Sequence, residues 1–326
     1  MTDVSTIRVG VLACEGYCPH TAPIWAPILE QGQMHGATGT PSRFLPMSIT
    51  RVWDVNRQAA ERLATQCVDA RVVDGYADMV GQVDGVILDE FNSCQHFAEL
   101  ARPYLEAGTP MFINRPFAMS LADAHQIIDL ARKHDAPLIC ASTFEFAPEI
   151  HSIQQRVAAC DPIAGYSVAN SMSDYATHGV HGLMFAHACM GGGVRSVAYQ
   201  TPDWHEPNGV VTIEHEPRDG GKVFYGSVQE VSGTWGWIRV FGGAGFEQSI
   251  SAGPYFWLPL LLEIQRLFQT RQMPQPYEAI LEKTQIFLAG FKSHLECGGA
   301  PVALTDIGDF VAPRLHPDPY PEGFFG

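Results

Sequence analysis

Short apolar runs alternate with amphipathic segments through the first 141 residues, and this alternation constrains the fold more than any other feature. Apolar, β-branched runs predict strands at residues 7–12, 49–53, 85–88, 111–113 and 137–141. The segments between them predict helices at residues 24–29, 56–66, 93–107 and 120–134. Strands that alternate with helices indicate an α/β domain built on a doubly wound parallel sheet.

The pattern changes in the second half of the chain. A helix predicted at residues 148–159 is followed by strand-like runs, several of them separated by glycine-rich turns, at 166–169, 194–199, 210–214, 223–228, 235–241 and 246–250. No helices fit between the later runs, which indicates a large, mostly antiparallel open sheet. Two helices are expected at residues 257–269 and 277–296. The sequence therefore predicts two domains, residues 1–147 and an α+β domain at residues 148–326.

The charge and cysteine content exclude several classes of protein. Twenty basic residues face 35 acidic ones, a net charge of −15, which argues against nucleic acid or an anionic membrane as the main partner. None of the eight cysteines forms a C-x-x-C pair, and Cys14 and Cys18 have no second pair with which to bind zinc. We see no signal peptide and no apolar run near the ~18 residues that span a bilayer. These observations predict a cytoplasmic protein with reduced thiols.

The stretch from Met111 to Ala118 combines a buried strand with a charged end. The strand stops at Asn114, Arg115 and Pro116, because proline lacks a backbone donor and restricts the residue before it. Arg115 is therefore expected at the carboxyl end of a strand, where open α/β sheets bind their ligands. An arginine that closes a loop against a carboxylate is the alternative interpretation.

Several segments resemble the glucose–fructose oxidoreductase/inositol dehydrogenase (Gfo/Idh/MocA) family. They are residues 95–108 continuing to 114–118, residues 177–182 followed by 190–197, and residues 298–304. The resemblance implies a Rossmann-type dinucleotide-binding domain at residues 1–147 and a substrate-binding and oligomerisation domain at residues 148–326. It also implies an NAD(P)-dependent oxidoreductase that takes a hydride from a hydroxyl of a sugar, polyol or cyclitol. Homo-oligomers, dimers or tetramers, would form through the large sheet.

The dinucleotide fingerprint G-x-G-x-x-G is altered in this chain. Its three glycine positions fall on Ala13, Glu15 and Cys18, whereas Gly10 and Gly16 lie nearby in a different spacing. Ala13 can make the tight turn. Glu15 places a carboxylate where a pyrophosphate should rest on a helix N-terminus, unless the loop turns it outward. We still predict NAD or NADP over residues 13–16, which include Cys14.

Four further residues are expected at the cofactor. Asp54 ends the second strand, where an acid accepts hydrogen bonds from the adenosine ribose, although it also suits the cap of the following helix. Arg57 is placed to meet a 2′-phosphate, so the choice between NAD and NADP stays open. Asn92 and His96 fall beside the nicotinamide position that the resemblance implies, and a structural hydrogen-bonding role is the other interpretation of His96.

The resemblance also places the catalytic residues. His181 falls on the family's catalytic histidine, and Arg115 replaces its pocket lysine. An arginine stays protonated, so it polarises an oxygen but does not act as a base. His181 is therefore the predicted proton acceptor. Asp174 and His178 are the next candidates.

Two other functions remain open from the sequence. A lyase, hydrolase or isomerase acting on a sugar would use His181, His178 and Asp174, and the loss of the lysine and the fingerprint glycines favours it. A non-catalytic sugar or nucleotide sensor is the other. The spacing of His178, His181 and His187 also suits metal ligands, but such histidines are more often solvated or packed in a core, and we predict no metal site. Residues 313–326, with four prolines and several aromatics, are expected to lie extended over a surface.

Overall fold

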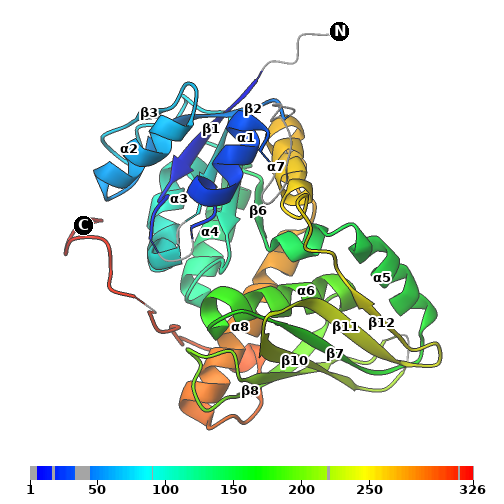
Figure 1. Cartoon of the computed structure of the whole chain (residues 1–326). Helices are drawn as coiled ribbons and strands as arrows, with labels where there is room; N and C mark the ends of the chain where they lie inside the picture. The colour runs from blue at the N-terminus through cyan, green and yellow to red at the C-terminus, as the bar shows by residue number, and fades with distance from the viewer. Residues whose placement is uncertain are drawn as a thin grey trace.

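The computed structural model describes residues 6–16, 19–33, 45–89, 91–218, 221–314 and 316–325. Cys18, one of the predicted fingerprint positions, lies outside these ranges. Figure 1 shows a parallel sheet with its helices in the N-terminal half, and an open sheet covered by helices in the C-terminal half. No helix among the described residues is both long enough and apolar enough to cross a membrane.

The first sheet has six parallel strands. They are β1 (Ile7–Leu12), β2 (Met47–Trp53), β3 (Arg71–Val72), β4 (Gly85–Leu88), β5 (Met111–Asn114) and β6 (Leu138–Ala141). Their order, β3-β2-β1-β4-β5-β6, confirms the predicted doubly wound sheet and places its switch point between β1 and β4. The sequence missed β3, because two residues carry no periodicity to detect.

The helices of this half, two of which begin at side-chain caps, alternate with its strands. They are the π-helical turn η1 (Thr21–Trp25) leading into α1 (Ala26–Gln31), α2 (Arg57–Gln66), the 3-10 turn η2 (Phe91–His96) leading into α3 (Phe97–Glu106), and α4 (Leu121–Lys133). The Asn56 side chain accepts from Gln58 N, and Ser120 Oγ accepts from Asp123 N at 3.1 Å. The helix predicted from residue 93 begins at Phe97, because a 3-10 turn forms its first part.

The second sheet has seven strands. They are β7 (Ile163–Ser171), β8 (Val194–Gln200), β9 (Val210–His215), β10 (Phe224–Ser232), β11 (Thr234–Gly242), β12 (Phe246–Ser249) and β13 (Val302–Ala303), in the order β12-β11-β7-β10-β9-β8-β13. All neighbouring pairs are antiparallel except β7 and β10, which confirms a mostly antiparallel sheet. The parallel pair is possible because a helix and two strands separate β7 from β10 in the chain.

The helices of the second half pack against both sheets. They are η3 (Thr143–Phe146), α5 (Glu149–Ala159), η4 (Tyr175–Gly179) with α6 (Val180–Met190), α7 (Leu258–Thr270), α8 (Tyr277–Cys297) and η5 (Leu304–Asp306). α5, α6 and α8 cover the second sheet, whereas α7 lies beside the first (Figure 1). A side chain on Gly85 of β4 would meet the Phe268 ring of α7 at 2.4 Å, so only glycine permits this approach. A domain boundary at residue 147 thus falls between η3 and α5. α7 follows this boundary in the sequence but packs against the first domain.

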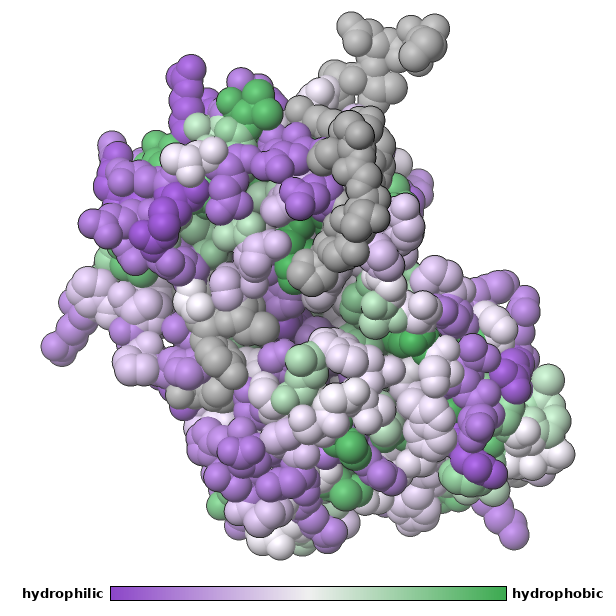
Figure 2. Space-filling model, in the orientation of Figure 1, coloured by the Kyte–Doolittle hydropathy of each residue, from purple (hydrophilic) through white to green (hydrophobic). Residues whose placement is uncertain are grey.

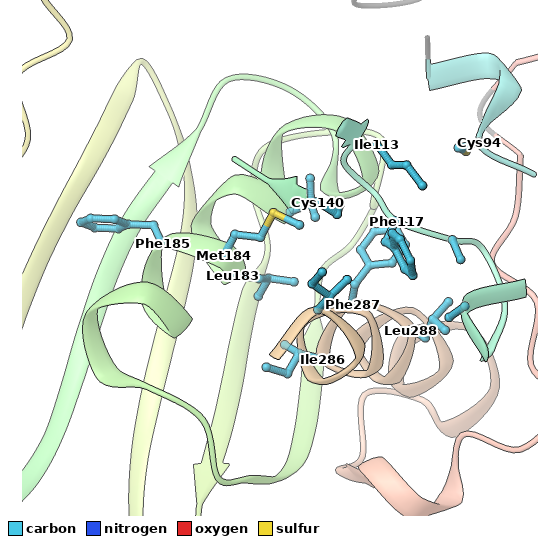
Figure 3. Close-up of a cluster of buried hydrophobic side chains, with 14 of the residues drawn as sticks. Cys94, Ile113, Phe117, Cys140, Leu183, Met184, Phe185, Ile286, Phe287 and Leu288 are labelled. Atoms are coloured by element: carbon cyan, nitrogen blue, oxygen red, sulfur yellow. The ribbon is translucent and has the colours of Figure 1, made fainter. Parts of the chain in front are cut away.

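A continuous apolar core joins the two halves beneath the carboxyl ends of β5 and β6. Figure 3 shows Ile113 and Cys140 from these strands near Met184 of α6 and Phe287 of α8. Cys140 is a buried free thiol whose pKa burial raises to about 12, so it serves as a small apolar side chain. The apolar core therefore fixes α6 against the edge of the parallel sheet. On the surface, Figure 2 shows hydrophilic residues gathered most densely over the N-terminal domain.

Candidate functional site

Arg115 lies buried at the end of β5, between two histidines. Its Nε donates to Nε2 of His181 at 3.2 Å. Its Nη1 and Nη2 lie 3.4 and 3.3 Å from the two ring nitrogens of His20. Only 2% of Arg115 is exposed. The structure thus brings Arg115 and His181 together, as the sequence predicts, and adds His20, which the sequence analysis did not single out.

His181 is neutral and fixed in one tautomer. Arginine only donates hydrogen bonds, so Nε2 is the acceptor and Nδ1 carries the hydrogen. Nδ1 lies 2.6 Å from Oγ of Ser142, which receives that hydrogen. Burial, and then the positive charge of Arg115, hold the pKa of His181 well below its usual value. The ring therefore keeps a lone pair on Nε2, facing a permanent cation.

A chain of contacts from α8 holds Ser142 in place. Ser142 and Glu145 form a capping box at η3, in which Glu145 Oε1 accepts from Ser142 N at 2.7 Å. Glu145 Oε2 lies 2.6 Å from the buried Nζ of Lys283, which also donates to the carbonyl of Cys140 at 3.0 Å. Each donor and acceptor is satisfied, so the oxygen that orients His181 has a fixed position.

Asp89 and Asn114 complete the buried polar cluster. Asn114 Nδ2 donates to Asp89 Oδ1 at 2.9 Å. Asp89 Oδ2 accepts from the backbone amides of His20 and Thr21, at 2.9 and 2.7 Å. Burial raises the pKa of Asp89. The sequence contained a signal for this residue, because Asp89 directly follows the apolar run of β4 at the ligand-binding edge.

Asp174 and His178 lie at the start of the helix that carries His181. Asp174 Oδ1 accepts from Thr177 N at 2.7 Å, so the carboxylate caps this helix start. His178 Nδ1 lies 2.6 Å from Ser173 Oγ, and the rings of His178 and His181 are 6.0 Å apart. Burial, reinforced by Arg115, lowers the pKa of His178 to about 4. Asp174 thus positions the helix, and His178 is a second neutral imidazole beside the cluster.

His187, the third histidine in the spacing that suits metal ligands, pairs with a glutamate. His187 Nε2 lies 3.1 Å from Glu282 Oε2 on α8. Within the described part of the chain, no group of three or more His, Cys, Asp or Glu side chains is arranged to hold a metal ion.

The loop after β1 takes the shape that the fingerprint glycines usually give. Ala13 has φ 53°, a left-handed conformation, at the first glycine position, and Gly16 has φ 147°. The amides of Cys14 and Glu15 donate to Asp54 Oδ2 at 2.7 and 3.1 Å. The loop therefore makes the tight turn without the glycine, and Asp54 anchors it.

Glu15 is turned toward α2. Its carboxylate forms an ion pair with Arg62 and accepts from Asn56 Nδ2 at 3.1 Å. The positive charge of Arg62 therefore offsets the carboxylate that the sequence places at a pyrophosphate position. With the left-handed turn at Ala13 and the acid Asp54 at the end of β2, these residues fit a dinucleotide at its phosphate and ribose positions.

The remaining predicted cofactor residues have mainly structural partners. Arg57 is exposed and pairs with Glu61 at 3.2 Å and Asp74 at 2.8 Å. Gly10 lies inside β1, where a Cβ would come within 3.1 Å of Met79 Sδ, so close packing explains this glycine.

Asn92 and His96 both lie in η2. Asn92 lines a small cavity with Gln95 and Arg314. His96 Nε2 lies 3.0 Å from Asp318 Oδ2, and its ring stacks on Phe325 at 4.8 Å. The C-terminal part of the chain therefore holds His96 in place.

Comparisons with known proteins agree with this architecture. Residues 27–142 match the Gfo/Idh/MocA family of oxidoreductases with an NAD-binding Rossmann fold. No protein with a curated description matches the chain. Three solved structures, all of low sequence identity, share the fold over most of the chain.

Each of these structures aligns with more than nine-tenths of both chains. GenD2 from gentamicin A biosynthesis, in complex with NAD, has a TM-score of 0.69 at 17% identity, covering 92% of this chain and 97% of its own. The myo-inositol dehydrogenase of Lactobacillus casei, with NAD(H) and myo-inositol, has a TM-score of 0.71 at 13% identity, covering 91% and 96%. The scyllo-inositol dehydrogenase of the same organism, with NAD(H) and scyllo-inositol, has a TM-score of 0.72 at 11% identity, covering 92% and 100%.

The family match confirms the predicted assignment to NAD-dependent oxidoreductases. It covers most of the parallel-sheet half and begins after the altered fingerprint at residues 13–18. The three solved structures also share the fold of the second half of the chain, because their alignments include both halves. The chain thus matches the model of the Gfo/Idh/MocA family over residues 27–142 and shares, over most of its length, the fold of solved structures that include two inositol dehydrogenases.

Proposed function

We propose that the protein oxidises a hydroxyl of a sugar, polyol or cyclitol, with His181 as the proton acceptor and Arg115 as the group that polarises the reacting oxygen. The observation that carries this proposal is the buried contact between Arg115 Nε and His181 Nε2, at 3.2 Å. A permanent cation beside a neutral imidazole is the pair that deprotonation of an alcohol requires. The myo-inositol and scyllo-inositol named with two of the similar structures support the substrate class.

Arg115 and His181 have different roles in the proposed reaction. A bound nicotinamide would supply the hydride acceptor at this site. Arg115 stabilises the alkoxide that develops on the substrate, because its charge does not depend on pH in the ordinary range. The substrate hydroxyl takes the place of the Arg115 Nε–H at His181 Nε2 and gives its proton to that atom. Ser142 keeps the hydrogen on Nδ1, so the basic lone pair stays on the substrate side.

Among the two dinucleotides, we propose NAD. The Arg57 guanidinium, which the sequence places near a 2′-phosphate, pairs with Glu61 and Asp74. Asp54 adds a negative charge at the ribose position, which disfavours a phosphate and suits free hydroxyls.

The experiment has two stages. Calorimetric titration with NAD and NADP measures cofactor binding, and a panel of inositols and sugars is then tested for formation of reduced nicotinamide. His181→Asn should lower kcat by about 10²–10⁴-fold while the affinity for NAD stays unchanged. His187→Asn, on the same helix but paired with Glu282, is the matched control and should keep full activity. Absence of heat with both dinucleotides, from the full chain and from a chain ending at Pro313, would overturn the proposal.

We also propose a homo-oligomer that forms through the second sheet, in a cytoplasmic protein. Large apolar side chains are exposed on its strands: Tyr225, Val231 and Phe241 are 54%, 42% and 44% exposed. Light scattering after size-exclusion chromatography tests this, since Tyr225→Glu should shift the protein toward the monomer.

A non-redox enzyme acting on a sugar is the second candidate. The observation that favours it is the pair of histidines on either side of Arg115, with Asp89 as a buried acid of raised pKa. Such an enzyme would transform a sugar without added dinucleotide, and His20→Gln would abolish that activity. A ligand sensor would bind the sugar and turn over nothing in either assay.

A further inference from the structure

The segment from residue 311 to residue 325 crosses from the second half of the molecule to the first. Ala312 N donates to the carbonyl of Met119 at 2.8 Å, and Gln95 Nε2 donates to the carbonyl of Ala312 at 3.3 Å. Figure 1 shows the segment leaving the second domain and ending on the side of the parallel sheet that carries α2 and β3. We call the described residues 311–314 and 316–325 the crossing segment.

Aromatic side chains dock the crossing segment on the parallel-sheet domain. The Tyr320 ring, 6% exposed, lies nearly parallel to Trp53, with centroids 6.4 Å apart, and meets His96 edge-on at 4.9 Å. Phe325 stacks on His96 at 4.8 Å and meets Tyr76 at 5.8 Å. Trp53, Tyr76 and His96 therefore form an aromatic cradle filled by side chains of the same chain.

A polar anchor holds the crossing segment in register on this cradle. Asp318 pairs with Arg314 and lies 3.0 Å from His96 Nε2. Its Oδ1 also accepts from the amide of Tyr320 at 3.0 Å, which forms a local turn. The turn presents Tyr320 to the domain, so its docking is built by several specific contacts.

Trp53 and Tyr76 of the cradle lie where the fold places the adenosine half of a dinucleotide. His96, which the resemblance set beside the nicotinamide, is joined to them through Tyr320 and Phe325. Trp53 is the last residue of β2 and precedes Asp54, the acid at the ribose position. Tyr76 follows β3, and His96 ends the turn after β4, so all three residues lie along the carboxyl edge of the sheet. Flat aromatic walls suit a purine ring by stacking. The crossing segment thus places three aromatic rings, those of Tyr320, Phe324 and Phe325, on a surface whose chemistry fits adenine.

We infer that the crossing segment is an autoinhibitory plug, which covers the adenosine site and must move before a dinucleotide binds. The inference rests on the proposed function. A protein whose competent state is only a fraction f of the population shows a dissociation constant raised by 1/f. A plug that is closed nine-tenths of the time or more therefore weakens binding by about tenfold or more. Anything that draws the segment off the cradle would activate the protein.

The test is a calorimetric titration of NAD and of ADP-ribose into four chains. They are the full chain, a chain ending at Pro313, the double variant Tyr320→Ser/Phe325→Ser, and Glu322→Gln as the control on the same segment. Both plug-opening chains should bind about tenfold or more tightly than the full chain, and Glu322→Gln should not differ from it. Hydrogen exchange gives a second readout: NAD should remove protection from residues 316–325 of the full chain.

The outcomes separate this inference from the proposed function. If the full chain binds NAD and neither variant binds more tightly, the plug is overturned and the cofactor assignment stands. Binding by the opened chains alone supports both, and no binding by any of the four overturns both. If the shortened chain fails to fold, as judged by thermal melting, the double variant decides the matter.

Discussion

Arg115 Nε lies 3.2 Å from His181 Nε2, across a distance of 66 residues in the sequence. The same guanidinium reaches both ring nitrogens of His20 with its other two nitrogens. A lysine ammonium is a compact point charge and does not span both rings in this way. The arginine therefore changes the geometry of the site, as well as removing a group that can titrate.

Arg115→Met should raise the pKa of His181. The guanidinium lowers that pKa by repelling a second positive charge, so its loss brings the value closer to the ordinary one near 6.5. The histidines lose their donor in the buried cluster, which should cost about 1–3 kcal/mol of unfolding free energy. NMR titration of the His181 ring measures the first effect, and an unchanged pKa would contradict it. Arg239→Met, at an exposed site, is the control.

Ser142→Ala should weaken both the fold and the site. The side chain caps η3 and receives the Nδ1 hydrogen of His181, so its loss should lower the unfolding free energy by about 0.5–2 kcal/mol. Without this partner the imidazole tautomer is no longer fixed, and kcat should fall while NAD affinity is kept. Ser142→Thr retains the hydroxyl and should restore kcat. Equal turnover in the serine, alanine and threonine proteins would exclude a positioning role.

Ala13→Gly should stabilise the protein. Ala13 has φ 53°, and a left-handed conformation costs a residue with a Cβ about 1–2 kcal/mol. Glycine removes that cost but adds entropy to the unfolded chain, so the net gain should be about 0.5–1 kcal/mol. Chemical denaturation measures it. Ala60→Gly, inside α2, should instead destabilise by about 1 kcal/mol, and a loss at both sites would contradict the strained turn.

Glu230→Gln should flatten the dependence of stability on pH. Burial raises the pKa of Glu230 to about 7, and its Oε2 accepts from the Tyr199 hydroxyl at 2.6 Å. An acid whose folded pKa is raised binds more protons when folded, so its contribution is present below pH 4.5 and is lost between pH 4.5 and 7. The loss should reach roughly 3 kcal/mol at pH 8, at 1.36 kcal/mol per unit.

The measurement is the unfolding free energy of both proteins at pH 5 and pH 8. The wild type should lose more stability than Glu230→Gln as the pH rises. An identical loss in the two proteins would show that another group titrates.

Both sheets, apart from their shortest strands, could be predicted from the amino-acid sequence. The parallel sheet follows from apolar runs that alternate with helices, and the capped helix starts follow from Asn56 and Ser120, because both signals act within a few residues. The position of Arg115 at the edge of β5 follows from Pro116 in the same way. Resemblance then predicted the partner, His181, that the structure places beside it.

The neighbours of these residues, in contrast, depend on how the elements pack against one another. Glu15 faces Arg62 because α2 docks beside the loop. His20 meets Arg115, and Asp89 meets His20 and Asn114, because the ends of three different strands lie at one edge of the sheet. The crossing segment and α7 both come from the C-terminal part of the sequence but pack against the first domain. Such contacts depend on how elements pack, and side-chain periodicity reports only which face of an element is buried, never which neighbour covers it.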